Sequence, residues 1–189
     1  MSAIKIKNLD KSFAGVTLFN QFNFELSTGS LGLITGSNGK GKSTLLKIIA
    51  GAMKAKGEIE IDDSFCFIPA ERCYDSFLTL KENALVLVQD QDLVDQMLID
   101  WGLKDFQKTK MKDLSHGMQK RMLLGTFLTH NVAVFLFDEP LLHLDKDWIQ
   151  VFIDKISKKI EQGASILIAT HHPERFRELK PVEVNLNEL

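Results

Sequence analysis

The sequence predicts an α/β fold with a largely parallel sheet at its core. Short β-rich segments precede a glycine-rich loop, and segments of helical period alternate with apolar, strand-like segments after it. This alternation is typical of parallel strands joined by helices. The 189 residues are enough for one domain with a substantial core. We therefore expect a single domain.

The expected strands lie on both sides of the loop. They are predicted at residues 4–7, 22–26, 31–35, 65–68, 132–137 and 165–169. One further segment, residues 57–62, alternates apolar and polar side chains, as a half-exposed strand does. We place this segment on an antiparallel flap.

Three segments have helical period. The first follows the loop, the second begins at Leu93 and stops near Gly102, and the third precedes Gly163, a plausible end. Asp145 or Asp147 could cap the start of the third helix. Its apolar residues recur at helical spacing: Ile149, Ile153, Ile156 and Ile160.

The loop at residues 36–44 matches the full pattern G-x-x-x-x-G-K-[S/T]. It lies between an expected strand and an expected helix, where backbone N–H groups can surround phosphate oxygens. Lys42 is expected to hold the β- and γ-phosphates, and Ser43 to place its hydroxyl on Mg²⁺. The sequence therefore predicts a nucleotide site formed by Gly36, Ser37, Asn38, Gly39, Lys40, Gly41, Lys42, Ser43 and Thr44.

Two carboxylates, Asp138 and Glu139, end the apolar segment at 132–137. The carboxyl end of a parallel strand is where α/β sheets bind ligands. Successive side chains of an extended chain point apart, so Asp138 can face Mg²⁺ while Glu139 faces the γ-phosphate. Glu139 is then the expected general base for an attacking water. Without the phosphate loop, a pair of surface acids would be the better interpretation.

Two further sites are weaker when taken alone. Ser115 lies in an N-cap position and Gly117 leaves the next turn uncovered, which predicts a second anion site, although a serine before a helix is usually only a cap. His171 follows the strand at 165–169 on the same edge of the sheet. A lone histidine is more often structural than catalytic, so its location carries the hypothesis.

Taken together, these motifs resemble those of ATP-binding cassette (ABC) ATPase domains. Residues 36–44 resemble the family's phosphate loop, 114–121 its L-S-G-G-Q signature, 137–140 its Walker B segment, 144–145 its D-loop, and 170–171 its switch histidine. The resemblance implies a P-loop NTPase fold over residues 1–189, with an antiparallel β flap and a short helical lobe at about 75–125.

The resemblance also implies how the domain works. Two such domains pair head to tail, as a homodimer or heterodimer, and Ser115 and Gly117 of one close over ATP held by Lys42 of the other. Asp145 is also an implied nucleotide-binding residue, in the loop across which His171 reports bound ATP to the opposite subunit. Lys42, Glu139 and His171 are the implied catalytic residues. Phe13 falls where the family stacks an aromatic ring on adenine, although a phenylalanine at a strand end is also ordinary core.

Two positions depart from the family pattern. His116 stands where the signature usually has glycine, and it could crowd or hydrogen-bond the nucleotide. After the strand at 65–68 the family expects a glutamine that touches Mg²⁺ and the water, but Ala70 and Glu71 follow here. Either Glu71 takes over this role or the ATPase works without that ligand.

Composition and charge bear on which partners and which cellular compartment we expect for this chain. The net charge is −2, from 23 basic and 25 acidic residues that are interspersed, so no nucleic-acid partner is expected. The longest apolar run, residues 132–137, is far shorter than the roughly 20 residues that span a bilayer. Cys66 and Cys73 fit neither a disulfide framework nor a metal pair, which favours a reduced, cytosolic chain.

We therefore expect the separate ATP-binding and ATP-hydrolysing subunit of a membrane transporter, with ATP and Mg²⁺ as cofactors. It would be cytoplasmic and peripheral at the inner face of the membrane, through a separate membrane-spanning subunit. In such family members the surface around the missing glutamine and the helical lobe receives a short helix of that subunit. The apolar stretch at 77–88 could form part of this surface, although buried core is the more common use for most of such a stretch. The alternative is a soluble ABC-type ATPase, such as an iron-sulfur assembly ATPase. The signature and His171 oppose a P-loop kinase or GTPase.

Overall fold

The computed structural model describes residues 1–13, 15–71 and 73–188. It divides into two compact units. The first comprises Met1–Ala70, Val132–Glu139 and Ile156–Leu189, and the second comprises Glu71–Asn131 and Pro140–Lys155. The first unit holds two sheets, and the second is helical. The single-domain assignment with a lobe at about 75–125 stays a prediction, and residues 140–155 join the second unit in addition to that range.

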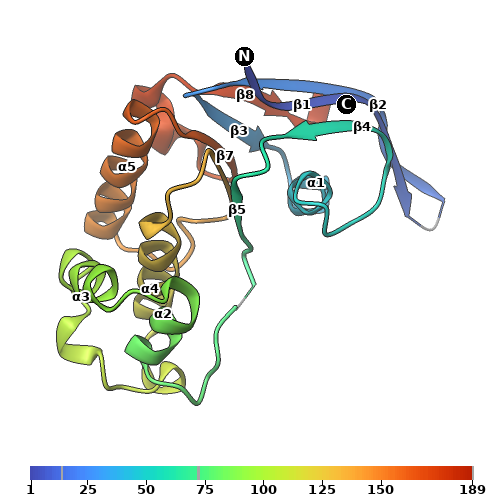
Figure 1. Ribbon diagram of the computed structural model, residues 1–189. Helices are drawn as coiled ribbons and strands as arrows, with labels where there is room; N and C mark the ends of the chain where they lie inside the picture. Colours follow the sequence, from blue (N-terminus) through green and yellow to red (C-terminus); the bar gives the residue numbers. More distant parts are fainter. Residues whose placement is uncertain (14, 72, 189) are drawn as a thin grey trace. The chain divides into compact units, whose positions relative to one another are not determined.

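A five-stranded parallel sheet forms the centre of the first unit (Figure 1). The strands of its middle are buried at every position, because helices and the second sheet cover both faces. The predicted α/β fold with a parallel core is confirmed. In spatial order the strands are β5 (Phe65–Ile68), β6 (Val134–Asp138), β7 (Ser165–Ala169), β3 (Leu31–Thr35) and β8 (Val182–Asn185).

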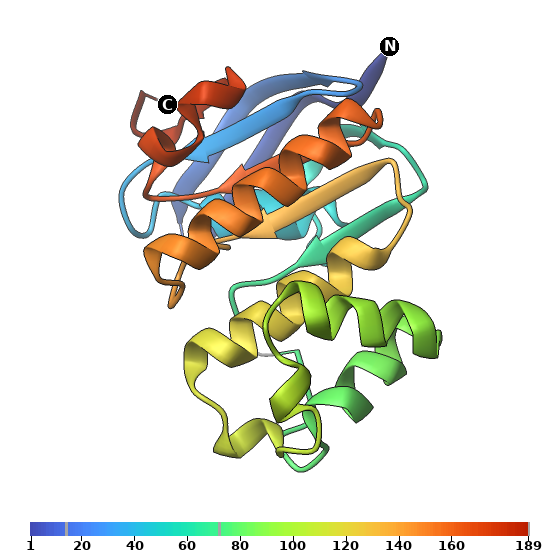
Figure 2. The same ribbon diagram turned by 90° about the vertical axis from the view of Figure 1, so that its left-hand side faces the viewer.

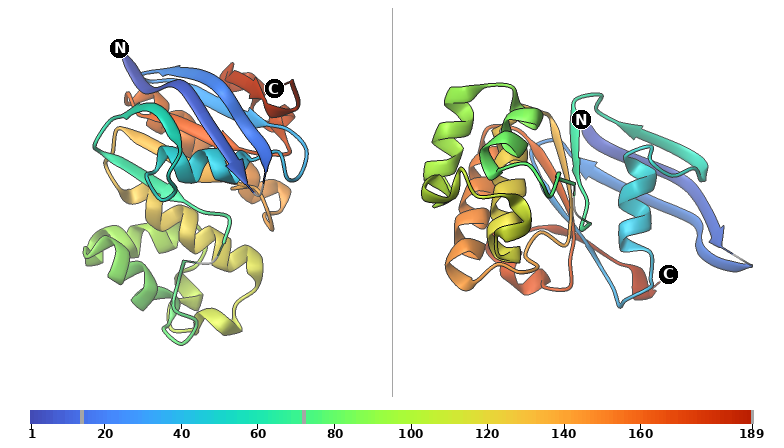
Figure 3. Two further views of the ribbon diagram at one scale, coloured as in Figure 1. Left: turned by 90° about the vertical axis from the view of Figure 1, so that its right-hand side faces the viewer. Right: turned by 90° about the horizontal axis from the view of Figure 1, so that it is seen from below.

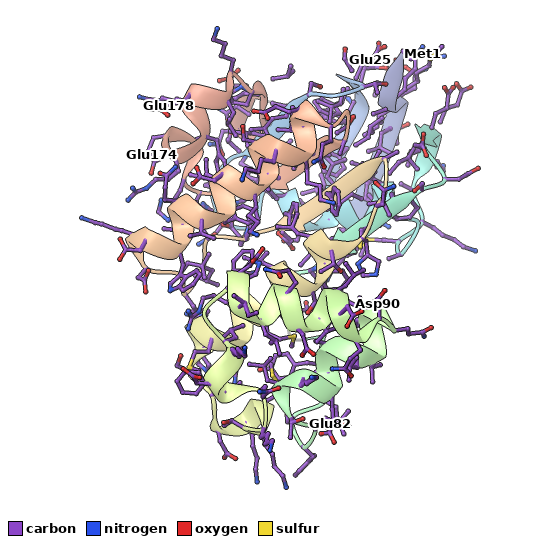
Figure 4. All side chains as sticks on the ribbon, turned by 60° about the vertical axis from the view of Figure 1, so that its left-hand side comes forward. Met1, Glu25, Glu82, Asp90, Glu174 and Glu178 are labelled. Carbon is purple, nitrogen blue, oxygen red and sulfur yellow. The ribbon has the colours of Figure 1, made fainter. Side chains whose placement is uncertain are left out.

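The flap is an antiparallel sheet in the order β2-β1-β4. β1 (Ser2–Phe13) and β2 (Val16–Ser27) are each 12 residues long, well beyond the short strands expected at 4–7 and 22–26. β4 (Lys56–Ile61) pairs with β1, as the alternation at 57–62 predicted. At one end of the sheet, the Ser2 hydroxyl donates to the carboxylate of Glu25, which Figure 4 labels beside Met1.

α1 (Lys42–Ile49) lies between the two sheets of the first unit (Figure 3). Its apolar side chains Leu45, Leu46, Ile48 and Ile49 belong to a buried cluster with residues of both sheets. α1 is therefore held firmly by apolar packing.

The last turns of α5 (Lys146–Glu161) lie over β6 and β7 (Figure 2), and there Nζ of Lys159 lies 5.6 Å from the ring centroid of Phe135. Two 3₁₀ segments, η3 (Pro173–Leu179) and η4 (Leu186–Glu188), flank β8.

Local capping explains where the helices of the second unit begin. α2 (Leu80–Val88) starts with a capping box between Thr79 and Glu82, and Asp90 caps α3 (Gln91–Asp100). Figure 4 labels Glu82, in the first turn of α2, and Asp90, the residue before α3. α3 ends before Gly102, whose φ of 60° supports the predicted stop. Two short 3₁₀ segments, η1 (Lys104–Phe106) and η2 (Met111–Asp113), lead to α4 (His116–Thr129).

None of the helices formed by the described residues combines the length and the apolarity that crossing a bilayer requires. Cys66 and Cys73 are both partly buried, and no disulfide joins them.

Candidate nucleotide-binding site

The phosphate loop connects β3 to α1 in the first unit. α1 begins at Gly41, which has a φ of 95° and leaves the helix start without a side-chain cap. A Cβ on Gly41 would lie 2.7 Å from the side chain of Leu18, so both the backbone and the packing require glycine here. The uncapped N–H groups at the start of α1 are therefore available to an anion.

A residue from the far end of the sequence anchors the loop. The side-chain oxygen of Asn187 accepts hydrogen bonds from the backbone N–H of Ser37 at 3.1 Å and from its hydroxyl at 2.9 Å. Asn187 was not predicted as a site residue. No local motif marks it, because β8 carries it to the loop only in the folded sheet.

Lys42 is 7% exposed and makes three contacts. Its Nζ lies 2.9 Å from the carbonyl oxygen of Gly36, 3.4 Å from that of Ser37 and 2.9 Å from Nε2 of His171. Burial lowers the pKa of Lys42, whereas the negative charges of Glu139 and Asp138 oppose this shift. A protonated lysine has only donors, so Nε2 of His171 accepts and the ring proton lies on Nδ1.

Ser43 and Asp138, the predicted metal ligands, lie side by side. The hydroxyl of Ser43 donates to Oδ1 of Asp138 at 3.0 Å, and Asp138 is 2% exposed at the end of β6. A hydroxyl oxygen and one carboxylate beside a phosphate site fit Mg²⁺, which prefers few carboxylates and completes its shell with phosphate oxygens and water. The two residues therefore suit Mg²⁺ bound with a nucleotide.

Glu139 follows β6 with a φ of 47°, so it is no longer part of the extended strand from which its direction was predicted. Its N–H donates to the carbonyl oxygen of Ala169 at 2.9 Å. The backbone N–H of His171 donates to Oε2 of Glu139 at 3.4 Å. Oε1 is buried and accepts no hydrogen bond within the described part of the chain, although Nε2 of His171 lies 3.3 Å away. With its proton on Nδ1, His171 cannot donate to this oxygen, which leaves Oε1 as an open acceptor.

His172, the rival of His171, points elsewhere. Its Nδ1 lies 3.3 Å from a carboxylate oxygen of Glu174, and its side chain is 61% exposed. The structure thus brings His171, and not His172, to Lys42 and Glu139. Lys42, Glu139 and His171 line one cavity of about 260 Å³. The other described residues of its lining are Asn38, Gly39, Gly41, Ser43 and Thr44.

Phe13 is not among the described residues that line this cavity. It ends β1 with its side chain 45% exposed, which opposes the alternative of a core phenylalanine. The Nζ of Lys11 lies 4.7 Å from the centroid of its ring. Phe13 is therefore an accessible aromatic surface in the same unit as the phosphate loop.

The signature residues lie together in the second unit. Ser115 caps α4 by accepting a hydrogen bond from the N–H of Met118 at 3.2 Å, and Asp145, rather than Asp147, accepts from the N–H of Trp148 at 3.0 Å. A Cβ on Gly117 would lie 2.8 Å from the carbonyl oxygen of His143. A small cavity of about 80 Å³ is lined by Ser115, Gly117, Met118, Arg121, His143, Leu144, Asp145 and Trp148.

Aromatic and cationic groups that the sequence did not single out surround this second cavity. The guanidinium carbon of Arg121 lies 4.2 Å from the ring centroid of Trp148, and its Nη1 donates to the carbonyl oxygen of Trp101 at 3.1 Å. Burial lowers the pKa of Arg121, and Asp145 opposes the shift. The rings of His116 and His143 are 5.1 Å apart, so the unusual residue of the signature packs against another imidazole.

The position of the expected glutamine lies just beyond β5. Ile68 pairs with Phe137 at the end of the parallel register between β5 and β6. Ala70 comes two residues after Ile68, and Glu139 comes two residues after Phe137. Ala70 is exposed, and its methyl group offers no metal ligand. Glu71 is also exposed and begins the second unit. The replacement of the glutamine by Glu71 stays a prediction.

Comparisons with known proteins agree with this geometry. The family model for ABC transporters matches residues 19–142. The cytochrome c biogenesis ATP-binding export protein CcmA of Reclinomonas americana is 34% identical over 195 residues, covering 90% of this chain and 88% of that protein. CcmA of Escherichia coli strain K12 is 28% identical over 187 residues, covering 91% and 90%.

A solved structure of an ATP-binding subunit of an ABC transporter has the same fold. It matches with a TM-score of 0.85 at 22% identity, covering 94% of this chain and 82% of the other. The comparisons give no support to an iron-sulfur assembly ATPase. With the phosphate loop, the acid pair and the signature in place, the chain belongs to the ABC transporter family, as an ATP-binding subunit of the kind that hydrolyses ATP.

Proposed function

We propose that this subunit hydrolyses Mg²⁺-bound ATP at the phosphate loop and drives a membrane-spanning subunit supplied by another chain. The observation that carries the proposal is the convergence of Lys42, Glu139 and His171 on one cavity of about 260 Å³, beside the contact between Ser43 and Asp138. In this proposal the set would supply a phosphate cradle, a metal site and a base.

The phosphates would bind at the start of α1. The uncapped N–H groups and the positive end of the helix dipole favour an anion, and Lys42 adds a formal charge. Ser43 and Asp138 would hold Mg²⁺, which neutralises phosphate charge when bound. The negative phosphates would also favour the charged form of Lys42, against the effect of its burial.

Glu139 would take the proton of the attacking water. Its Oε2 is held by the backbone N–H of His171, and its Oε1 is the buried acceptor that nothing in the described part of the chain satisfies. A water hydrogen-bonded to Oε1 would sit beside the phosphate cradle, ready to transfer its proton as it attacks the γ-phosphate. His171 would fix the direction of this carboxylate and contact the γ-phosphate side of the site.

The second unit would complete the site of a partner copy. Ser115 and Gly117 lie at the N-terminal end of α4, a 14-residue helix whose dipole favours a phosphate, and Asp145 lines the same small cavity. We infer a head-to-tail pair, as a homodimer or with a related chain, in which each copy binds ATP and covers the ATP of the other.

The membrane-spanning partner would dock on the helical unit. Phe77 and Val86 are 72% and 63% exposed there, whereas Leu80 and Ala84 of the same stretch are buried in its core. The similarity to export proteins named CcmA supports export as the direction of transport. In this arrangement the subunit is cytoplasmic and attaches to the inner face of the membrane through its partner.

The dependence of ATPase activity on protein concentration tests the paired site. Because Ser115 and Gly117 come from a second copy, the rate per subunit should rise with the concentration of purified protein. Lys42→Ala should lose both nucleotide binding and turnover at every concentration. Strict proportionality between rate and concentration over the whole range would contradict a site assembled from two copies.

A further inference from the structure

Lys11 makes a cation–π contact with the exposed ring of Phe13. Its Nζ lies 4.7 Å from the ring centroid, within the range of a favourable contact. An exposed phenyl group would otherwise sample several rotamers at the end of a strand. The contact with Lys11 reduces this freedom and occupies one part of the aromatic surface.

A second contact holds the ammonium group of Lys11 in place. Its Nζ donates to the backbone carbonyl oxygen of Lys54 at 2.7 Å, in the loop between α1 and β4. The adjacent carboxylate, Asp10, accepts a hydrogen bond from the backbone N–H of Gln21 at 2.7 Å. Lys11 therefore connects the ring of Phe13 to the backbone that follows α1, the helix of the phosphate loop.

The surroundings of Lys11 are positively charged. A cavity of about 470 Å³, larger than the one at the phosphate loop, is lined by Asp10, Lys11, Ser12, Lys54, Ala55 and Lys56. Its lining therefore includes three lysines and one aspartate, an excess of positive charge that favours electron-rich or anionic ligands in general. Of these three lysines, Lys11 is the one whose contact with the ring is found in the described part of the chain, so the ring-specific effect and the general charge effect belong to different residues.

We infer that Lys11 is a positioning residue for the purine base of ATP, because it orients the ring of Phe13 as a stacking platform. The inference rests on the proposed function, since it requires that Phe13 stacks on the base. Orienting the ring before binding removes part of the entropy cost of stacking. A cation on one face of the ring also draws π-electron density toward itself, which favours stacking of an electron-rich purine on the ring.

Calorimetry with two ligands tests the inference. AMP-PNP with Mg²⁺ carries both base and phosphates, and inorganic tripolyphosphate with Mg²⁺ carries phosphates alone. Lys11→Met should weaken AMP-PNP binding by about threefold, the size of an exposed cation–π contact, and should leave tripolyphosphate binding unchanged. Lys11→Arg should restore AMP-PNP binding. Lys56→Met, the matched control, removes a charge from the same cavity and should not change the ratio of the two affinities.

A double-mutant cycle with Phe13→Ala completes the test. The effect of Lys11→Met should disappear when Phe13 is already alanine. An equal loss for both ligands, or an effect that persists without the ring, would overturn the inference and leave Lys11 as a general charge. If Phe13→Ala itself does not weaken AMP-PNP binding, the base platform is wrong while the phosphate loop stands. Failure of both ligands to bind the unaltered protein would overturn the proposed function itself.

Discussion

The two proposed phosphate sites use the same device, the start of a helix, but differ in how that start is satisfied. The N-cap residue of α1 is Gly41, which has no side chain to accept a hydrogen bond from the first N–H groups of the helix. α4 begins at Ser115, whose hydroxyl accepts from the N–H of Met118. The first helix start therefore leaves its N–H groups for a ligand, whereas the second is partly satisfied by its own sequence.

The side chains around the two helix starts also differ in whether they are left open for a ligand. Lys42, Asp138 and Glu139 are clustered at the first site, with Oε1 of Glu139 an open acceptor. At the second, the guanidinium of Arg121 lies over the ring of Trp148, and the carboxylate of Asp145 already accepts a hydrogen bond from the N–H of Trp148. This difference is consistent with the proposed division of roles, in which the first unit performs the chemistry and the second covers a phosphate held by a partner copy.

The strongest test of this division removes the base from the first unit. Glu139→Gln keeps the shape of the side chain but cannot accept the proton of the water, so turnover should fall about a hundredfold or more. AMP-PNP binding should be retained, and a closed dimer should accumulate with ATP, which size-exclusion chromatography can detect. Near-normal ATPase activity in this variant would contradict the proposed role of Glu139, because the chemistry would then not depend on this carboxylate.

A smaller loss is expected from crowding the second site. Alanine at Gly117 would place its Cβ 2.8 Å from the carbonyl oxygen of His143 and push away the segment that carries Asp145. Helix propensity alone would favour alanine, so any loss comes from this contact. Steady-state turnover should fall about tenfold, the effect of a 1.4 kcal/mol mismatch, while AMP-PNP affinity stays unchanged.

His143→Asn is the matched control for Gly117→Ala. Asparagine tolerates the left-handed backbone of residue 143, whose φ is 69°, and it keeps the carbonyl oxygen while removing the imidazole. Turnover close to that of the unaltered protein would attribute the Gly117→Ala effect to the backbone contact. Weakened AMP-PNP binding in Gly117→Ala would contradict the division, since the second unit would then shape the nucleotide site of its own chain.

A still smaller effect is expected from the anchor of the phosphate loop. Asn187→Ala removes two hydrogen bonds to Ser37 and should weaken AMP-PNP and tripolyphosphate binding by about threefold each. Unchanged affinity in Asn187→Ala, measured by calorimetry, would show that the loop holds its shape without this anchor.

Asn187 also marks where prediction from sequence stops. The strand, loop and helix around residues 36–44 could be predicted because periodicity and glycine spacing are local properties. The partner of the loop lies 150 residues away and reaches it through the pairing of β8 with β3, which no local pattern encodes. The side chain of Asn187 therefore looks like an ordinary polar residue until the sheet order is known.

Glu139 gives a second example. Alternation along an extended strand predicted that it points away from Asp138, but the structure ends β6 at Asp138 and turns residue 139 to a φ of 47°. The direction of the carboxylate depends on that turn and on the N–H of His171. Likewise, β1 and β2 are much longer than predicted, since pairing with a neighbouring strand extends segments whose own pattern is weak.

A change of only about twofold is expected at Ala70, the last residue of the first unit before the chain enters the second. Ala70 lies two residues beyond the end of β5 and is exposed, so a glutamine can replace it without disturbing the core. The side-chain carbonyl of that glutamine could help to position metal and water, and Ala70→Gln should therefore raise the ATPase rate by about twofold.

Glu71→Ala is the companion variant, because Glu71 is the other candidate for the missing ligand. Steady-state rates of both across a Mg²⁺ titration separate the two cases. A rate that rises in Ala70→Gln and does not change in Glu71→Ala supports an ATPase that works without this ligand. A weaker Mg²⁺ dependence in Glu71→Ala, with little change in Ala70→Gln, would mean that Glu71 takes the role of the absent glutamine. Unchanged kinetics in both variants would remove this loop from the mechanism and leave the first unit to perform hydrolysis with its own residues.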